Sequence, residues 1–199
     1  MFNGIKAIIF DMDGTLIDTG QLHELAWTKT LSHFDIPLDK ALMRSLAGVP
    51  TIETLERLIQ HFDCAQVAPL DHINEFKESY VANEIKNFVK PTPLIDIVRQ
   101  ANLNIPMTVG TGAYTQEAKT ILSYCGLTAE IDHVVGADQV SNPKPAPDTF
   151  LRCAKLVGVA SEHCLVFEDA QMGIQAAKAA NMKVIDVQQE LNIVNHYFL

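Results

Sequence analysis

The first clear pattern in the chain is an apolar segment, residues 5–10, that ends abruptly in acidic residues. Its last four residues are apolar without alternation, which is typical of a strand buried on both faces of a sheet. Asp11 and Asp13 follow at once, and Gly14 and Thr15 complete the stretch. Two close carboxylates repel each other and are costly to remove from water. The pattern therefore indicates a metal ion and a phosphate-type substrate that make the pair tolerable.

A helical pattern takes over between residues 19 and 88. Apolar residues recur there at helical spacing, without a convincing strand. Asp39 and Thr51 are the expected N-caps of two helices. We predict a four-helix insertion, with breaks at 36–37, 48–50 and Pro69.

From residue 89 onward, strand and helix patterns alternate. Strands are predicted at 107–109, 133–135, 164–167 and 184–187. Helices are predicted at 93–101, 116–124, 147–157 and 172–180, and Gly126 and Gly158 end the second and the third. Such alternation implies right-handed crossovers and a mostly parallel sheet, which the first strand joins across the insertion.

The predicted fold class is therefore α/β, a doubly wound and mostly parallel sheet with a Rossmann-like core and an inserted four-helix cap. We expect the core at 1–17 and 88–199, the cap at 18–87, and hinges near 17–19 and 87–91. The segment after Gln188 has no clear pattern and is expected either to dock on the core or to fray.

Composition narrows the setting. Of the 199 residues, 48% are hydrophobic and 20% are charged, as in an ordinary globular protein. The net charge of −9 argues against a nucleic-acid partner, and it requires local positive charge to bind a phosphate ester. We see no signal peptide and no stretch long enough for a membrane span, so a cytoplasmic location without a membrane partner is expected. The oligomeric state is left open.

The chain has four cysteines, Cys64, Cys125, Cys153 and Cys164. They form no CxxC pair, which argues against a zinc site and for a reducing compartment.

Polar groups follow the strands of the predicted sheet. Besides the first acidic pair, Thr111 follows the second strand, Lys144 lies beyond the third, and Glu168 and Asp169 end the fourth. Taken singly, each has an ordinary explanation as a turn, a solvated lysine or a helix cap. Parallel strands bring their carboxyl ends to one edge, however, and ligands bind there. Together these groups therefore favour a functional site.

The chemistry that these groups permit is phosphoryl transfer. Carboxylates form aspartyl-phosphate intermediates, and Mg²⁺ prefers oxygen ligands such as Asp11, Asp169 and the backbone carbonyl of Asp13. Lys144 and Thr111 would bind the phosphoryl oxygens and offset their charge. Asp13 is then free to protonate the leaving oxygen and to activate water, and nearby negative charge is expected to keep it protonated at first.

These residues resemble the four motifs of the haloacid dehalogenase-like hydrolase superfamily, and the resemblance covers nearly the whole chain. It implies that Asp11 is the nucleophile and Asp13 the general acid and base. It also implies that Thr111 and Lys144 bind the phosphoryl group. The implied metal ligands are Asp11, Asp13, Glu168 and Asp169, with Glu168 as a helper that binds either directly or through water.

Further stretches resemble the beta-phosphoglucomutase subgroup: Asp18 with Thr19, His23, Trp27, 142–150 and 168–175. The mutases hold a second phosphate with basic cap residues. This chain has no Lys or Arg between Arg44 and Arg57, and the helix around 80–82 lacks the corresponding lysine. Hydrolysis of a monophosphate is therefore favoured, and residues 48–51 and 109–112 resemble bacterial fructose-1-phosphate phosphatases.

The resemblance implies that the substrate is held by Thr19, His23, Trp27, Gly48, Thr51 and Gly112. On the residues alone, His23 is either a satisfied core histidine or a substrate ligand. Trp27 is either core or an apolar wall for a sugar.

The sequence thus predicts a Mg²⁺-dependent phosphatase for a small sugar phosphate, closed by its cap during the first step. The nearest alternative is a phosphosugar mutase. A phosphoacceptor signalling domain combines a similar sheet, aspartate, hydroxyl and lysine, but it lacks the helical insertion. A non-catalytic binding protein is disfavoured by the intact set of motifs.

Overall fold

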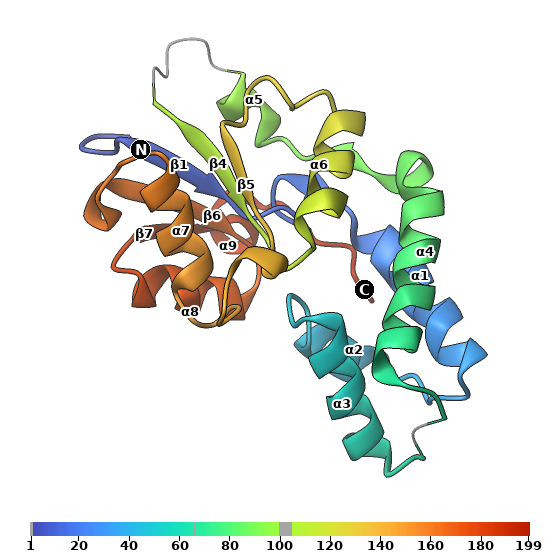
Figure 1. Cartoon of the computed structure of the whole chain (residues 1–199). Helices are drawn as coiled ribbons and strands as arrows, with labels where there is room; N and C mark the ends of the chain where they lie inside the picture. The colour runs from blue at the N-terminus through green and yellow to red at the C-terminus, as the bar shows by residue number, and fades with distance from the viewer. Residues whose placement is uncertain (1, 66, 100–104) are drawn as a thin grey trace.

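A parallel sheet forms the centre of the protein. The computed structural model describes residues 2–65, 67–99 and 105–199. Its strands are ordered β5-β4-β1-β6-β7 (Figure 1), with bounds β1 Ala7–Phe10, β4 Met107–Gly110, β5 His133–Val135, β6 Cys164–Glu168 and β7 Lys183–Asp186. The chain adds β4 and β5 on one side of β1, and then β6 and β7 on the other. This reversal makes the carboxyl end of β1 the topological switch point, where open parallel sheets bind ligands.

Helices cover both faces of this sheet. Ile8 and Phe10 of β1 pack in the hydrophobic cluster that includes α5 (Ile95–Val98) and α6 (Thr115–Tyr124). Alternate residues of the same strand, Ala7 and Ile9, pack in a second cluster with α7 (Asp148–Leu156) and α8 (Gln171–Ala179). Because both faces are buried, the strand needs the uninterrupted apolar run seen in the sequence. Two 3₁₀ turns, Ala137–Gln139 and Ser161–His163, complete the core connections.

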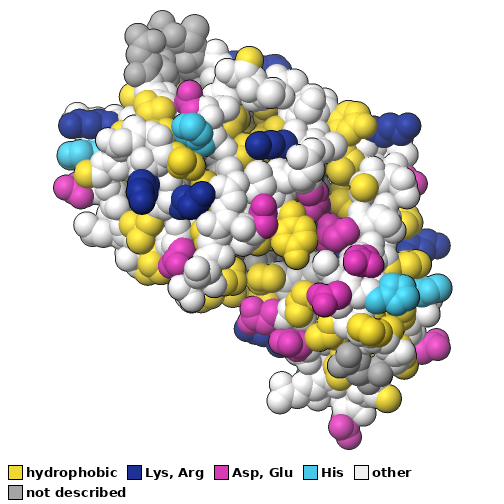
Figure 2. Space-filling model, viewed as in Figure 1, with side chains coloured by type: hydrophobic (Ala, Val, Ile, Leu, Met, Phe, Trp, Pro, Cys, Tyr) yellow, Lys and Arg dark blue, Asp and Glu magenta, His cyan; other side chains and the backbone are white. Residues whose placement is uncertain are grey.

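The helical insertion lies between two short strands, β2 (Ile17–Asp18) and β3 (Lys90–Pro91), which pair antiparallel. Its helices are α1 Gly20–His33, α2 Lys40–Ser45, α3 Thr51–Phe62 and α4 Leu70–Phe88. They share a hydrophobic cluster of their own and project beyond the strand ends in Figure 1. On the face shown in Figure 2, lysine and arginine side chains are scattered, and several acidic side chains lie over these helices.

Local details differ from the sequence predictions in places. Asp39 caps α2 as predicted, because its side chain accepts a bond from the Leu42 N–H at 2.9 Å. Thr51 is not a cap: α3 begins at Thr51, and the extended Pro50 occupies the cap position.

The predicted helix 93–101 is shorter, since the Thr92 hydroxyl accepts from the Leu94 N–H and keeps residue 93 in a turn. Residues 100 and 101 lie outside the described residues. Helix α8 and strand β7 each begin one residue before the predicted start.

The segment after Gln188 is ordered by packing. Helix α9 (Val187–Leu191) is followed by an irregular stretch whose Ile193 is buried in the core. Tyr197 and Phe198, however, pack in the hydrophobic cluster of the insertion. The segment therefore docks on both parts of the molecule. None of the helices over the described residues is long and apolar enough to cross a membrane.

Candidate active site

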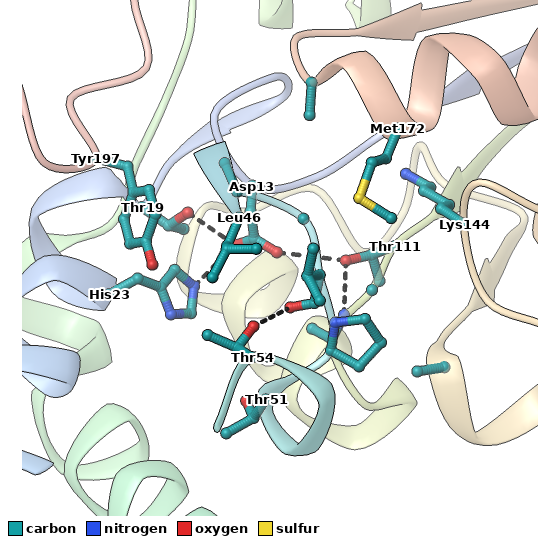
Figure 3. A pocket seen from close by; sticks show the side chains of 18 of the residues that line it. Asp13, Thr19, His23, Leu46, Thr51, Thr54, Thr111, Lys144, Met172 and Tyr197 are labelled. Carbon is teal, nitrogen blue, oxygen red and sulfur yellow. Dashed lines mark hydrogen bonds and ion pairs between the residues drawn. The ribbon is translucent and has the colours of Figure 1, made fainter. Parts of the chain in front are cut away.

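A cavity of about 170 Å³ lies between the carboxyl ends of the strands and the helical insertion (Figure 3). All the residues predicted for the site line it. The sheet core contributes Asp11, Asp13, Thr111, Gly112, Lys144, Glu168 and Asp169. The other side contributes Thr19, His23, Trp27, Gly48 and Thr51. The structure thus brings together residues that the sequence spreads over some 160 positions.

Lys144 joins two carboxylates at the floor of the cavity. Its Nζ donates to Asp11 Oδ1 at 2.6 Å and to Glu168 Oε1 at 2.7 Å. Asp11 follows β1 directly and Glu168 ends the neighbouring β6, so the paired strands fix both acids. Burial alone would lower the pKa of Lys144, but the two carboxylates outweigh it and raise the pKa above its ordinary value. The lysine therefore stays charged where a phosphoryl group would arrive.

A group of acidic oxygens beside Lys144 fits a divalent cation. Oxygens of Asp11, Glu168 and Asp169 all lie within 4.8 Å of one another. Burial and the nearby Asp11 charge raise the pKa of Glu168 to about 8 and that of Asp169 to about 6. Burial likewise raises the pKa of Asp11. A hard cation such as Mg²⁺ would relieve this repulsion, and carboxylate oxygens are the ligands it prefers.

Asp13 is held by three side chains. Its Oδ1 accepts from Thr19 Oγ1 at 2.7 Å and lies 3.2 Å from His23 Nε2, and its Oδ2 accepts from Thr111 Oγ1 at 3.3 Å (Figure 3). Burial would raise the pKa of Asp13, but the bonds from His23, Thr19 and Thr111 outweigh it and lower the pKa. The expectation that negative neighbours keep Asp13 protonated is therefore wrong for this arrangement. Asp13 instead raises the pKa of His23, against the opposing effect of burial, so the proton is held on the histidine side of the pair.

A glycine of α8 makes room for Glu168. A Cβ at Gly173 would lie 1.6 Å from Glu168 Oε1 and 2.0 Å from its Cδ. The other oxygen, Oε2, accepts from the Ala170 N–H at 2.7 Å. The start of α8 thus packs directly against the carboxylate that binds Lys144.

The far wall of the cavity carries a polar group that the sequence analysis missed. Lys77 of α4 is buried, donates to Glu78 Oε1 at 2.8 Å, and lies 5.5 Å from the Trp27 ring centre. Glu117 of α6 lies next to Glu78 at the cavity wall; burial and the Glu78 charge raise the pKa of Glu117 to about 8. One Glu117 oxygen, Oε1, is buried and has no hydrogen-bond partner among the residues that the structure describes. The conclusion that α4 supplies no lysine is therefore corrected, because Lys77 lies one turn before the positions considered.

The loop between α2 and α3 closes over the strand ends. A Cβ at Gly112 would lie 3.3 Å from the carbonyl oxygen of Gly48. Gly48 has φ +82 and lies close to Ala170 at the start of α8. A side chain at Gly112 would crowd the loop, and one at Gly48 would strain the backbone. Two predicted site residues thus serve in part as the contact between insertion and core.

Asn195 and Tyr197 also line the cavity, and no pattern in the sequence indicated either. Both lie in the segment after Gln188, where neither helical nor strand periodicity was visible. Lys77, Glu78 and Glu117 lie within amphipathic helices, where a charged residue usually faces water. Their position in the cavity depends on how the insertion packs on the core.

The profile described as "Haloacid dehalogenase-like hydrolase" matches residues 8–187. Fructose-1-phosphate phosphatase YqaB of Escherichia coli (strain K12) is 41% identical over 188 residues, covering 94% of this chain and 99% of that protein. Beta-phosphoglucomutase of Bacillus subtilis (strain 168) is 29% identical, covering 93% and 84%. A crystal structure of beta-phosphoglucomutase from Clostridium difficile aligns with a TM-score of 0.82 at 26% identity, covering 98% of this chain and 93% of that one. The predicted family and fold class are confirmed, and the chain belongs to the haloacid dehalogenase-like hydrolase family.

Proposed function

We propose that this protein is a Mg²⁺-dependent phosphatase that hydrolyses a small sugar monophosphate through an aspartyl-phosphate intermediate. The observation that carries the proposal is the arrangement of Asp11, Lys144 and Asp169 at the switch point of the sheet, under a cavity closed by the insertion. The name of the fructose-1-phosphate phosphatase relative confirms the enzyme class, a phosphoric monoester hydrolase. A ketose 1-phosphate is the first substrate to test. The cytoplasmic location stays a prediction.

In the first step, a carboxylate oxygen of Asp11 attacks phosphorus and the bond from phosphorus to the sugar oxygen breaks. Lys144, 2.6 Å from Asp11, holds the phosphoryl oxygens in line and offsets their charge. The proton that the leaving oxygen takes is held on His23, whose Nε2 lies 3.2 Å from Asp13 Oδ1, and it passes through the Asp13 carboxylate as the bond to the sugar breaks. Bound Mg²⁺, held by Asp11 and Asp169 with help from Glu168 and the Asp13 carbonyl, would supply further charge neutralisation.

In the second step, water attacks phosphorus of the aspartyl phosphate and Asp13 accepts the proton of that water. Inorganic phosphate leaves and the Asp11 carboxylate is restored. Thr19, His23 and Thr111 keep the Asp13 carboxylate aimed at the reacting oxygen in both steps. The insertion keeps bulk water out during the first step and has to open for product release.

The far wall of the cavity supports a monophosphate substrate. Among the described lining residues Lys77 is the lysine or arginine on that side, and its charge is already paired with Glu78. A second phosphate would meet the carboxyl groups of Glu78 and Glu117, and the part of the cavity wall that the structure describes offers it no unpaired lysine or arginine. Sugar hydroxyls, by contrast, can both donate to these oxygens and accept from the lysine.

The direct test is phosphate release from fructose 1-phosphate, glucose 1-phosphate and 6-phosphogluconate, with Mg²⁺ and with EDTA. We expect turnover of fructose 1-phosphate and glucose 1-phosphate, whose sugars are uncharged, only with Mg²⁺. In Asp11→Asn we expect the rate of phosphate release to fall by about 10³-fold or more. Asp96→Asn, at an exposed position on α5, is the matched control. Retained activity in Asp11→Asn would contradict the proposal.

A phosphosugar mutase is the second candidate, because beta-phosphoglucomutases are similar along nearly the whole chain. Glucose 1-phosphate supplied with glucose 1,6-bisphosphate separates the two activities. Release of inorganic phosphate supports the phosphatase. Conversion to glucose 6-phosphate without phosphate release would establish the mutase instead.

A further inference from the structure

The segment from Ile193 to Phe198 connects the sheet core with the insertion by a route separate from the two hinge strands. Ile193 is buried in the core cluster, whereas Tyr197 and Phe198 are buried in the cluster of the insertion. The Phe198 N–H donates to Glu24 of α1 at 3.1 Å. This segment lies beyond residues 8–187, which match the family.

Between these two anchors, Asn195 reaches the acidic group at the strand ends. Its Nδ2 donates to Asp169 Oδ2 at 2.7 Å, while its Oδ1 accepts from the Tyr197 N–H at 3.0 Å. The other oxygen of Asp169, Oδ1, accepts from Thr15 Oγ1 at 3.0 Å. Each carboxylate oxygen is therefore held by a donor from a different part of the chain.

Two glycines leave space for this arrangement. A Cβ at Gly14 would lie 2.2 Å from Asn195 Nδ2 and 2.6 Å from Asp169 Oδ2. A Cβ at Gly20 would lie 2.6 Å from the Tyr197 nitrogen and 2.8 Å from Asn195 Oδ1. Because these two positions before and after β2 have no side chain, the C-terminal segment packs directly against the backbone there.

We propose that Asn195 is a positioning residue that holds the Asp169 carboxylate in the orientation needed to bind Mg²⁺. The proposal rests on the proposed function only in the identity of the ion. Asp169 Oδ2 accepts from Asn195 at 2.7 Å and from Gln188 Nε2 at 3.5 Å, whereas Oδ1 accepts from Thr15. Because a carboxylate oxygen has two acceptor positions, Oδ1 keeps one for a cation while Asn195 fixes the orientation of the group through Oδ2. Donors behind metal-binding carboxylates fix their rotamer, and removing them costs about 10- to 100-fold in metal affinity or activity.

The test measures metal binding without substrate. Mn²⁺ binding, followed by EPR with Mg²⁺ as competitor, is compared between the wild type, Asn195→Ala and Asn195→Ser. Serine retains a hydroxyl that can accept from the Tyr197 N–H and keep the turn, but it is too short to reach Asp169. Val194→Ala, at an exposed position in the same segment, is the control. Thermal unfolding in EDTA reports whether each variant keeps its fold.

We expect both Asn195 variants to bind Mn²⁺ about 10- to 100-fold more weakly, with Val194→Ala unchanged. Saturating Mg²⁺ should restore most of kcat in Asn195→Ser. Wild-type affinity in Asn195→Ser would overturn the proposal, as would an equal loss in Val194→Ala. If the wild-type protein binds the ion but releases no phosphate from any sugar phosphate, only the proposed function fails.

Discussion

At the residue scale, the two aspartates after β1 have separate environments although they are two positions apart. Asp11 lies against Lys144 and the other acids, whereas Asp13 faces Thr19, His23 and Thr111. Thr19 holds the cap position of α1, where the structure shows no capping bond from its side chain, and its hydroxyl donates to Asp13. The separation explains how one carboxylate can attack phosphorus while the other handles protons.

The leaving-group role of Asp13 predicts a substrate-dependent loss. Asp13→Asn should lower kcat/KM for a sugar phosphate by about 10²- to 10⁴-fold, because a poor leaving group needs the proton. The loss should be much smaller for p-nitrophenyl phosphate, whose leaving group departs without one. Asp71→Asn, at an exposed position on α4, is the control. Equal losses for the two substrates would argue against this role.

Glu117 predicts a pH dependence of stability. Burial and the nearby Glu78 charge raise the pKa of Glu117 from its ordinary value of 4.5 to about 8, so between these values the folded protein holds a proton that the unfolded chain has lost. The free energy of unfolding therefore falls as the pH rises from about 4.5 to about 8. Glu117→Gln removes this dependence, and its Tm should exceed that of the wild type more at pH 8 than at pH 5. Glu162→Gln, at an exposed position, is the control; an increment independent of pH would contradict the assignment.

At the scale of elements, most of the helices and strands follow from local periodicity. The strands β4, β5 and β6 begin at the predicted residues. The buried β4 and β6 consist mostly of apolar residues, as expected of strands covered on both faces, whereas the edge strand β5 leaves His133 exposed. The cap of α3 and the length of α5 were predicted incorrectly. Both depend on contacts made by prolines and by a neighbouring threonine, which periodicity does not register.

The packing of α8 against the end of β6 gives a prediction at this scale. Gly173→Ala should displace the Glu168 carboxylate and with it Lys144, since the added Cβ falls 1.6 Å from Glu168 Oε1. Misplacement by about 1 Å costs on the order of 10²-fold in rate, and we expect such a loss in kcat/KM. Gln175→Ala, on the exposed side of the same helix, should be nearly silent. Full activity in Gly173→Ala would show that the contact has no catalytic importance.

At the scale of the whole molecule, the protein is acidic overall, and acidic groups also outnumber the lysine at the floor of the cavity. The net charge is −9, yet the floor of the cavity places one buried lysine among three carboxylates. Burial and mutual repulsion raise the pKa of all three carboxyl groups, so the fold alone does not stabilise their ionised forms. Folding and cation binding should consequently stabilise each other.

This coupling predicts that Mg²⁺ raises the melting temperature. At 100 times its Kd, an ion bound only by the folded state adds about 2.7 kcal/mol to the free energy of unfolding. For a chain of this size that corresponds to a rise in Tm of about 5 to 10 °C. The rise should disappear with EDTA and shrink in Asp169→Asn, as measured by differential scanning calorimetry. An equal rise in the variant would place the ion elsewhere.

The sequence by itself determined the sheet, the helical insertion and the residues at the strand ends. Each of these depends on neighbours in the chain: a buried strand fixes the direction of the residue that follows it, and parallel strands align their ends. Only the tertiary structure decided which residues from other parts of the chain line the cavity. The contact of Lys77 with the Trp27 ring, the position of Glu117 and the bond from Asn195 to Asp169 join separate elements. They depend on how the insertion and the C-terminal segment pack against the core, and local hydrophobic periodicity does not determine that packing.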